Sequence, residues 1–139
     1  KIMVVEEQQV TPFHLHWVKT EDIINRGGGN LILELAWSTE DERGFEDRSV
    51  RVSMDGVARK FVPCEKVTLA PGESITLPPL LYRKFYGESD RGTVMVGEVS
   101  RLNDDKNDNG FLEALGRFPD IEEDEPPYRL LCNEYPEGS

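Results

Sequence analysis

Cysteine and long apolar runs are scarce in this 139-residue sequence. Its two cysteines, Cys64 and Cys132, lie far apart and form no CxxC or Cys/His spacing typical of a zinc site. We therefore expect both to be reduced thiols. No apolar run approaches the roughly 20 residues that cross a bilayer, and no signal peptide opens the chain. These absences predict a cytoplasmic protein with no membrane contact.

Positive charge is also in short supply. The chain has 16 Lys and Arg against 27 Asp and Glu, which gives a formal net charge of −11. No cluster of Lys and Arg interleaved with aromatic residues offsets this excess, so the sequence predicts no nucleic-acid partner. Much of the acidity lies in residues 40–47 and 120–125, which we expect to be solvated loops.

The hydrophobic pattern has a period of two rather than 3.6, and turn signals interrupt it about every ten residues. Asp55-Gly56 between two extended runs indicates a hairpin, and Pro71-Gly72 indicates another turn. A helical turn is expected only near Leu112 to Leu115, and residues 103–109 read as a polar loop. Extended segments are expected at 10–17, 31–37, 50–54, 57–62, 67–69, 75–77, 81–86, 93–100 and 128–133. Many short strands within 139 residues predict a single all-β domain, a sandwich or a double-sheet jelly roll.

The only two histidines, His14 and His16, stand two positions apart in an expected strand. Side chains at i and i+2 of a strand point to the same face, so both imidazoles can converge on one ion. Glu21 follows after a turn at residues 17–20, where a second strand can bring its carboxylate alongside. Imidazole and carboxylate together suit a divalent first-row metal. The alternative is that two histidines merely decorate a strand surface.

The surroundings of these histidines favour the metal site. Gln8, His14, His16, Glu21 and Gly28 fall at the spacing of the first cupin motif, G-x5-H-x-H-x4-E-x6-G, with Gln8 in place of its opening glycine. Cupins are double-sheet jelly rolls whose chemistry lies in the barrel mouth.

The second cupin motif, G-x5-P-x-G-x2-H, begins at Gly72 and places its proline at Pro78, but Leu80 replaces its glycine and Arg83 its histidine. A guanidinium has no acceptor lone pair and stays protonated, so Arg83 cannot ligate a metal. Two arrangements remain open. Arg83 pairs with Glu21 and fills the site, or it swings out and a water completes a weaker site.

Longer stretches carry a closer resemblance. Residues 1–7, 11–35, 71–79, 96–109 and 116–136 resemble the D-lyxose isomerase family of bacterial cupins, above all in EDIINRGGGNL, which begins at Glu21. The resemblance implies a cupin double-stranded β-helix. It also implies interconversion of an aldose and a ketose, D-lyxose and D-xylulose or related sugars, with a divalent metal that is most often Mn, with Zn, Co, Ni or Fe as alternatives. The implied ligands are His14, His16, Glu21 and position 83.

Moving a proton between C1 and C2 of a sugar passes through an enediolate, which needs a base and stabilisation of oxygen charge. Glu98 shares a strand face with Val94 and Val96, so we expect an inward carboxylate that serves as the base, or else a structural one. Lys19 is expected to donate to a sugar oxygen, unless it is a solvated loop residue. Asp104 and Arg129 are weaker candidates for contacts with sugar hydroxyls.

The resembling family carries a segment before KIMVVEE, the start of this sequence, and we expect its absence to expose apolar surface and to favour a homodimer. Two other functions stay open. One is a cupin that has lost catalysis and binds a sugar or an anion through Arg83; the other is a cupin dioxygenase, which would need the same metal site.

Overall fold

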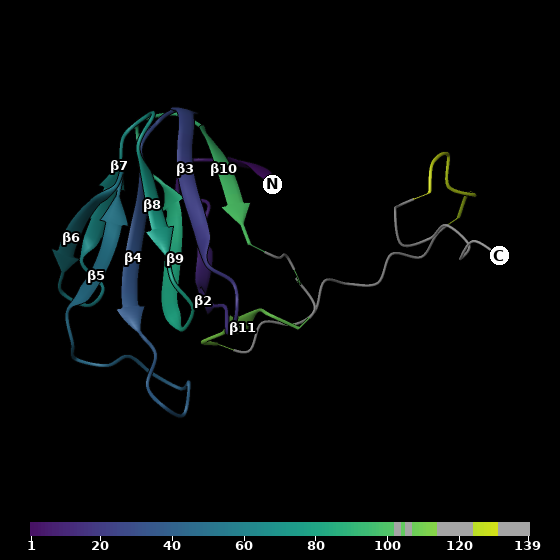
Figure 1. The fold of residues 1–139 in the computed structure, drawn as a ribbon. Coiled ribbons are helices and arrows are strands. Elements are labelled where there is room, and N and C mark those ends of the chain that lie inside the picture. Colours follow the sequence, from purple (N-terminus) through teal and green to yellow (C-terminus); the bar gives the residue numbers. More distant parts are fainter. Residues whose placement is uncertain (102–103, 105–106, 114–123, 131–139) are drawn as a thin grey trace.

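Antiparallel strands form the regular structure of the described residues, 1–101, 104, 107–113 and 124–130 of a computed structural model (Figure 1). The strands are β1 (Ile2–Val5), β2 (Thr11–Leu15), β3 (Glu21–Gly28), β4 (Leu31–Trp37), β5 (Val50–Met54), β6 (Val57–Phe61), β7 (Lys66–Leu69), β8 (Ser74–Leu77), β9 (Leu81–Gly87), β10 (Val94–Ser100) and β11 (Gly110–Phe111). They form a sheet in the order β1-β10-β3-β8-β5-β6 and a second in the order β11-β2-β9-β4-β7.

The hydrophobic core lies between the two sheets. Alternating residues of β4 and β10 supply much of it, since Leu31, Leu33, Val94 and Val96 are all fully buried. This period-two burial is the pattern predicted from the sequence. The all-β, two-sheet arrangement confirms the predicted fold class, and the barrel positions the inward-facing polar residues of β2, β3, β9 and β10 at one end of the core.

The backbone at two glycine positions, Gly56 of the predicted hairpin and Gly28 of the first motif, is one that glycine favours. Asp55 and Gly56 join β5 to β6 with φ of 48° and 79°, the left-handed conformation of a two-residue hairpin turn. Gly28, the last glycine of the first motif, has φ of 92°, and a Cβ there would lie 2.0 Å from the carbonyl oxygen of Thr93. Only glycine fits that position.

The two motif glycines that this chain has lost are also explained by the backbone. Gln8 and Leu80 stand in their places, and both have φ of 60°. The left-handed conformation that glycine adopts freely is therefore kept by residues for which it costs roughly 1–2 kcal/mol each. The motif's backbone shape survives the loss of its glycines.

Three expectations need correction or fall outside the described residues. No strand forms at Tyr128–Leu130, because no strand of the described residues pairs with it, and residues 131–133 of the predicted strand lie outside the described residues. Of the helical turn expected near Leu112 to Leu115, Leu112 and Glu113 form a bend, and residues 114–115 lie outside the described residues. Cys64 is a free thiol as predicted, while Cys132 lies outside the described residues. No helix long and apolar enough to cross a lipid bilayer occurs in the described part of the chain.

Candidate metal centre

Strands from opposite sheets bring the three predicted ligands together. His14 lies in β2, His16 directly follows its last residue, and Glu21 is the first residue of β3; the strand is thus shorter than the predicted segment 10–17. Their relative exposures are 8%, 4% and 3%, and one potential ligand atom from each lies within 4.8 Å of the others. The predicted turn at residues 17–20 therefore carries the chain from one sheet to the other across the barrel mouth.

Backbone carbonyls fix both imidazoles. Nδ1 of His14 lies 2.8 Å from the carbonyl oxygen of Pro12, and Nδ1 of His16 bonds to the carbonyl oxygen of Asp108. Since a carbonyl only accepts, Nδ1 carries the proton in each ring. Nε2 is then the nitrogen left for a metal, the arrangement in which metal-binding histidines are usually held.

Arg83 fills the position of the missing third histidine. It lies on β9 directly opposite His14 of β2, and its side chain is fully buried. Nη1 donates to Oε1 of Glu21 at 2.6 Å, and Nη2 donates to the carbonyl oxygen of Pro78 at 3.2 Å. Of the two arrangements left open by the sequence, the structure has the ion pair with Glu21. Within the described part of the chain, Nε of Arg83 has no hydrogen-bond partner.

Two further charged residues complete the cluster. Lys19 is 3% exposed, and its Nζ lies 3.0 Å from Oε1 of Glu98 and 3.4 Å from Oε2 of Glu21. Glu98 is 8% exposed and faces inward from β10, as the strand pattern predicted. Lys19 is thus not a solvated loop residue. The two carboxylates, Glu21 and Glu98, are balanced within the buried cluster by Lys19 and Arg83, and the exposed Lys1 adds a further positive charge 3.6 Å from Oε2 of Glu98.

The donor set fits a first-row divalent metal with three protein ligands. Ligand atoms bound at about 2.1 Å stand at most about 4.2 Å apart, so the group needs only a small contraction. Oε2 is the oxygen of Glu21 available to a metal, because Arg83 holds Oε1. Arg83 and Lys19 nevertheless oppose the binding of a cation, since they already neutralise the carboxylates.

Burial and the neighbouring charges shift two pKa values strongly. Burial lowers the pKa of His14 from 6.5 to about 4, opposed by the bond to Pro12 and helped by the charge of Arg83. Burial alone would raise the pKa of Glu21, but His16, Arg83 and Lys19 together lower it to about 2. The folded protein therefore holds His14 neutral and Glu21 ionised through mildly acidic pH.

Acid is expected to destabilise the metal-free protein through His14. Between about pH 6.5 and pH 4 the unfolded chain binds a proton at His14 that the folded chain does not, so stability falls as pH falls. Going from about pH 7 to about pH 5 should lower the free energy of unfolding by about 2 kcal/mol on this account. Urea unfolding in EDTA at both pH values measures it. His14→Gln should reduce this difference by about that amount, and an equal pH response in wild type and variant would contradict the prediction.

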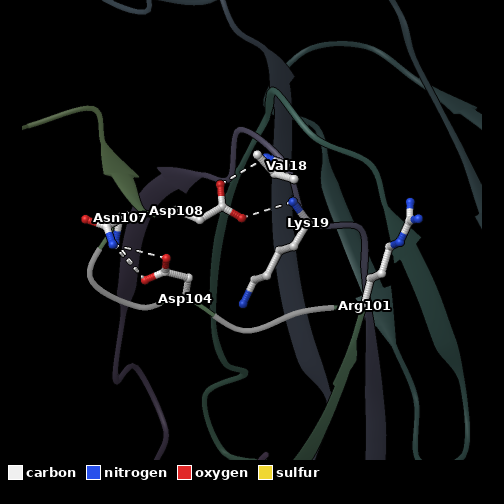
Figure 2. A pocket seen from close by; sticks show the side chains of 6 residues that line it. All are labelled: Val18, Lys19, Arg101, Asp104, Asn107 and Asp108. Atoms are coloured by element: carbon white, nitrogen blue, oxygen red, sulfur yellow. Dashed lines mark hydrogen bonds between the residues drawn. The ribbon is translucent and has the colours of Figure 1, made fainter.

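Two cavities adjoin the cluster. One, of about 140 Å³, is lined by the three candidate ligands together with Lys19, Glu98 and Phe85, among others. The other, of about 480 Å³, is lined by Val18, Lys19, Arg101, Asp104, Asn107 and Asp108 (Figure 2). Lys19 lines both, so it stands between the candidate metal centre and the larger cavity.

The remaining predicted residues lie at different places. Asp104 lines the larger cavity and accepts hydrogen bonds from Asn107, at the rim rather than beside the ligands (Figure 2). Arg129 is exposed, and its guanidinium lies 5.1 Å from the ring centre of Tyr128. The structure does not bring Arg129 to the cluster. Asp108 is a site residue that the sequence analysis missed, because it sits in a polar loop with no motif spacing.

Known proteins resemble this chain over almost its whole length. A sequence model of D-lyxose isomerase matches residues 1–135. A D-lyxose/D-mannose isomerase from Serratia proteamaculans is 54% identical over 135 residues, and one from Escherichia coli O157:H7 is 53% identical over 135 residues. Each match covers 97% of this chain and 59% of the relative. The chain thus spans about three fifths of the length of these relatives.

Solved structures support the fold. An L-ribose isomerase from Cellulomonas parahominis, solved with L-ribose, matches with a TM-score of 0.56 and 19% identity over 80% of this chain and 56% of that chain. A dTDP sugar isomerase from Desulfovibrio desulfuricans G20 matches with a TM-score of 0.56 and 13% identity over 80% of this chain and 61% of that chain. At these identities the likeness concerns the fold alone, and it agrees with the predicted cupin barrel.

Proposed function

The chain belongs to the D-lyxose isomerase family, and from this premise we propose that it is a metal-dependent aldose–ketose isomerase acting on D-lyxose and D-xylulose. One observation carries the proposal. His14, His16 and Glu21 converge within 4.8 Å in a buried cavity that also contains an inward-facing carboxylate and an ammonium group. This is the set of groups that sugar isomerisation requires.

His14, His16 and Glu21 are the proposed metal ligands, with Mn as the proposed ion. When bound, the metal would act as a Lewis acid that polarises sugar oxygens at C1 and C2. The carbonyls of Pro12 and Asp108 hold the two imidazoles in the required tautomer before any ion arrives. The ligand geometry is therefore largely set by the fold.

Glu98 is the proposed base that moves the proton between C1 and C2. Its carboxylate lines the same cavity as the ligands. Lys19 donates to Oε1 at 3.0 Å, and Nζ of the exposed Lys1 lies 3.6 Å from Oε2, so a sugar would reach Oε2 by displacing Lys1. Lys19 is placed to orient that carboxylate and to donate to a sugar oxygen. At about 140 Å³ the cavity is smaller than the roughly 300 Å³ of sites that enclose whole small-molecule ligands. The reacting end of the sugar would enter it and the remaining hydroxyls would point outward.

Asp104 is the proposed hydroxyl contact in the larger cavity, and a role for Arg129 stays a prediction.

Arg83 is proposed to impair the centre, because it removes one ligand and adds a positive charge beside Glu21. The alternative of anion binding through Arg83 gains no support, since its guanidinium is fully buried and two of its nitrogens already donate within the protein. A cytoplasmic location and a homodimer complete the proposal.

Isomerase activity tests the proposal directly. Purified protein is incubated with D-lyxose or D-mannose and added Mn²⁺, and ketose is measured with EDTA as the blank. Glu98→Gln is expected to lower the rate of ketose formation by at least about 100-fold, because it removes the base. Its affinity for Mn²⁺, measured by calorimetry, should stay within a few-fold of the wild-type value.

Glu34→Gln provides the matched control, since Glu34 is a carboxylate on β4 that pairs with Lys84 outside the cavity. It should retain the wild-type rate. If neither the wild-type chain nor Arg83→His forms ketose with Mn²⁺, Zn²⁺, Co²⁺, Ni²⁺ or Fe²⁺, the isomerase proposal is wrong.

A further inference from the structure

Asp108 connects a distant loop to the candidate metal centre. Its side chain accepts hydrogen bonds from three successive backbone N–H groups, those of Trp17 at 2.6 Å, Val18 at 3.0 Å and Lys19 at 3.0 Å. Figure 2 shows the bonds to Val18 and Lys19. Asp108 is 8% exposed; its bond to Lys19 is buried, and its bonds to Trp17 and Val18 are part-buried. The carboxylate thereby fastens the loop to the turn that separates His16 from Glu21.

The backbone carbonyl of the same residue accepts the Nδ1 proton of His16. The two histidines differ in this respect. The partner of His14 is Pro12, two residues away on the same strand, whereas the partner of His16 lies 92 residues further along the chain. The orientation of His16 therefore depends on how firmly the loop is held, while that of His14 does not.

Neighbouring contacts show that the loop is docked closely. Gly110 pairs with Leu15 in the β11–β2 ladder, and a Cβ at Gly110 would lie 2.8 Å from the ring of Trp17. The residues that follow Asp108 are thus paired with β2 and packed against the ring of Trp17. Asp108 is the point where this approach becomes a set of charge-assisted hydrogen bonds.

We propose that Asp108 is a positioning residue for His16. Its carboxylate holds residue 108 on the Trp17–Lys19 amides, and its carbonyl then keeps a proton on Nδ1 of His16, with Nε2 turned towards Glu21, 3.4 Å from Oε2. The consequence for metal binding rests on the proposed function; the consequence for the tautomer does not. Partners of this kind typically affect metal affinity about 10–100-fold.

The experiment compares wild type with Asp108→Ala in two measurements. Imidazole ¹⁵N NMR of the metal-free protein, at a pH above the ordinary histidine pKa of ~6.5, reports the tautomer of each ring. In wild type both rings should carry a proton on Nδ1. In Asp108→Ala, His16 should become a mixture of tautomers while His14, held by Pro12, stays Nδ1–H. Calorimetry with Mn²⁺ or Co²⁺ should show affinity lowered about 10–100-fold.

Asp55→Ala is the matched control, because Asp55 also accepts a hydrogen bond from a backbone N–H, that of Ser74, far along the chain from the loop. It should change neither measurement. If Asp108→Ala does not fold, the same two measurements are made on Asp108→Asn. The amide oxygen of asparagine can still accept hydrogen bonds, but its NH₂ group faces the N–H of Lys19 and cannot accept from it.

The outcomes are separable. An unchanged His16 tautomer in a folded Asp108 variant overturns the inference. A changed tautomer with unchanged metal affinity overturns its consequence for the metal. If wild type binds no metal at all, the proposed metal dependence fails while the tautomer measurement still decides the role of Asp108.

Discussion

Replacing Glu21 by glutamine is expected to lower the free energy of unfolding by about 3–5 kcal/mol. The substitution leaves the guanidinium of Arg83, which is fully buried, without its charged partner. The bond from Nη2 to Pro78 remains, but a neutral acceptor does not replace the charge of a carboxylate. Lys19 also loses one of its two carboxylates. Urea unfolding in EDTA at about pH 7, where Glu21 is ionised, measures the loss.

Two variants separate this effect from the loss of any ion pair. Glu34→Gln breaks the pair between Glu34, 14% exposed, and Lys84, 28% exposed. It should lower the free energy of unfolding by no more than about 1 kcal/mol. Glu21→Gln combined with Arg83→Met removes both buried charges and should recover much of the loss. A single Glu21→Gln variant as stable as Glu34→Gln would show that Arg83 finds another partner.

The alternation of residues predicted most of the fold and the core of the site. The alternate residues Leu31, Leu33 and Leu35 of β4, and Val94 and Val96 of β10, belong to the core. Alternation along a strand is a local property, so a sequence pattern reveals it. The same holds for His14 and His16, whose shared strand face follows from their spacing. Glu21 could be predicted as a ligand because only one short turn of the chain separates it from His16. In each case the relation joins residues close together in the chain.

The rest of the site depends on contacts that no spacing encodes. Lys19 read equally as a solvated loop residue, because its burial depends on Glu98, 79 residues away. The sequence could not choose between the two positions of Arg83, since the choice depends on whether its guanidinium reaches Glu21 across the barrel. Asp108 was missed because its role lies partly in its backbone carbonyl, which every residue type possesses. Residues 128–130 of the strand expected at 128–133 are not in a strand for the related reason that a strand needs a neighbour to pair with.

Replacing Arg83 by histidine is expected to tighten the binding of Mn²⁺ or Co²⁺ by at least about 10-fold and to raise ketose formation with it. Arg83 pairs with His14 across β9 and β2 and already points at Glu21, so an imidazole at this position is directed at the same centre. The change supplies a third nitrogen ligand. It also removes one positive charge, so that the cluster of Glu21, Glu98 and Lys19 carries a net negative charge before the ion binds.

Arg83→Met distinguishes the two contributions. Methionine removes the charge and the unpartnered buried Nε without supplying an imidazole, so it should raise metal affinity less than histidine does. Calorimetric titration of all three proteins separates the contributions. The difference between wild type and Arg83→Met gives the effect of the charge, and the difference between Arg83→Met and Arg83→His gives the effect of the added ligand. Equal affinities of Met and His variants would mean that charge alone weakens the centre. No gain in metal affinity with either variant would mean that position 83 does not limit metal binding. The positive charge that opposes the metal would then be that of Lys19, which both variants retain beside Glu21.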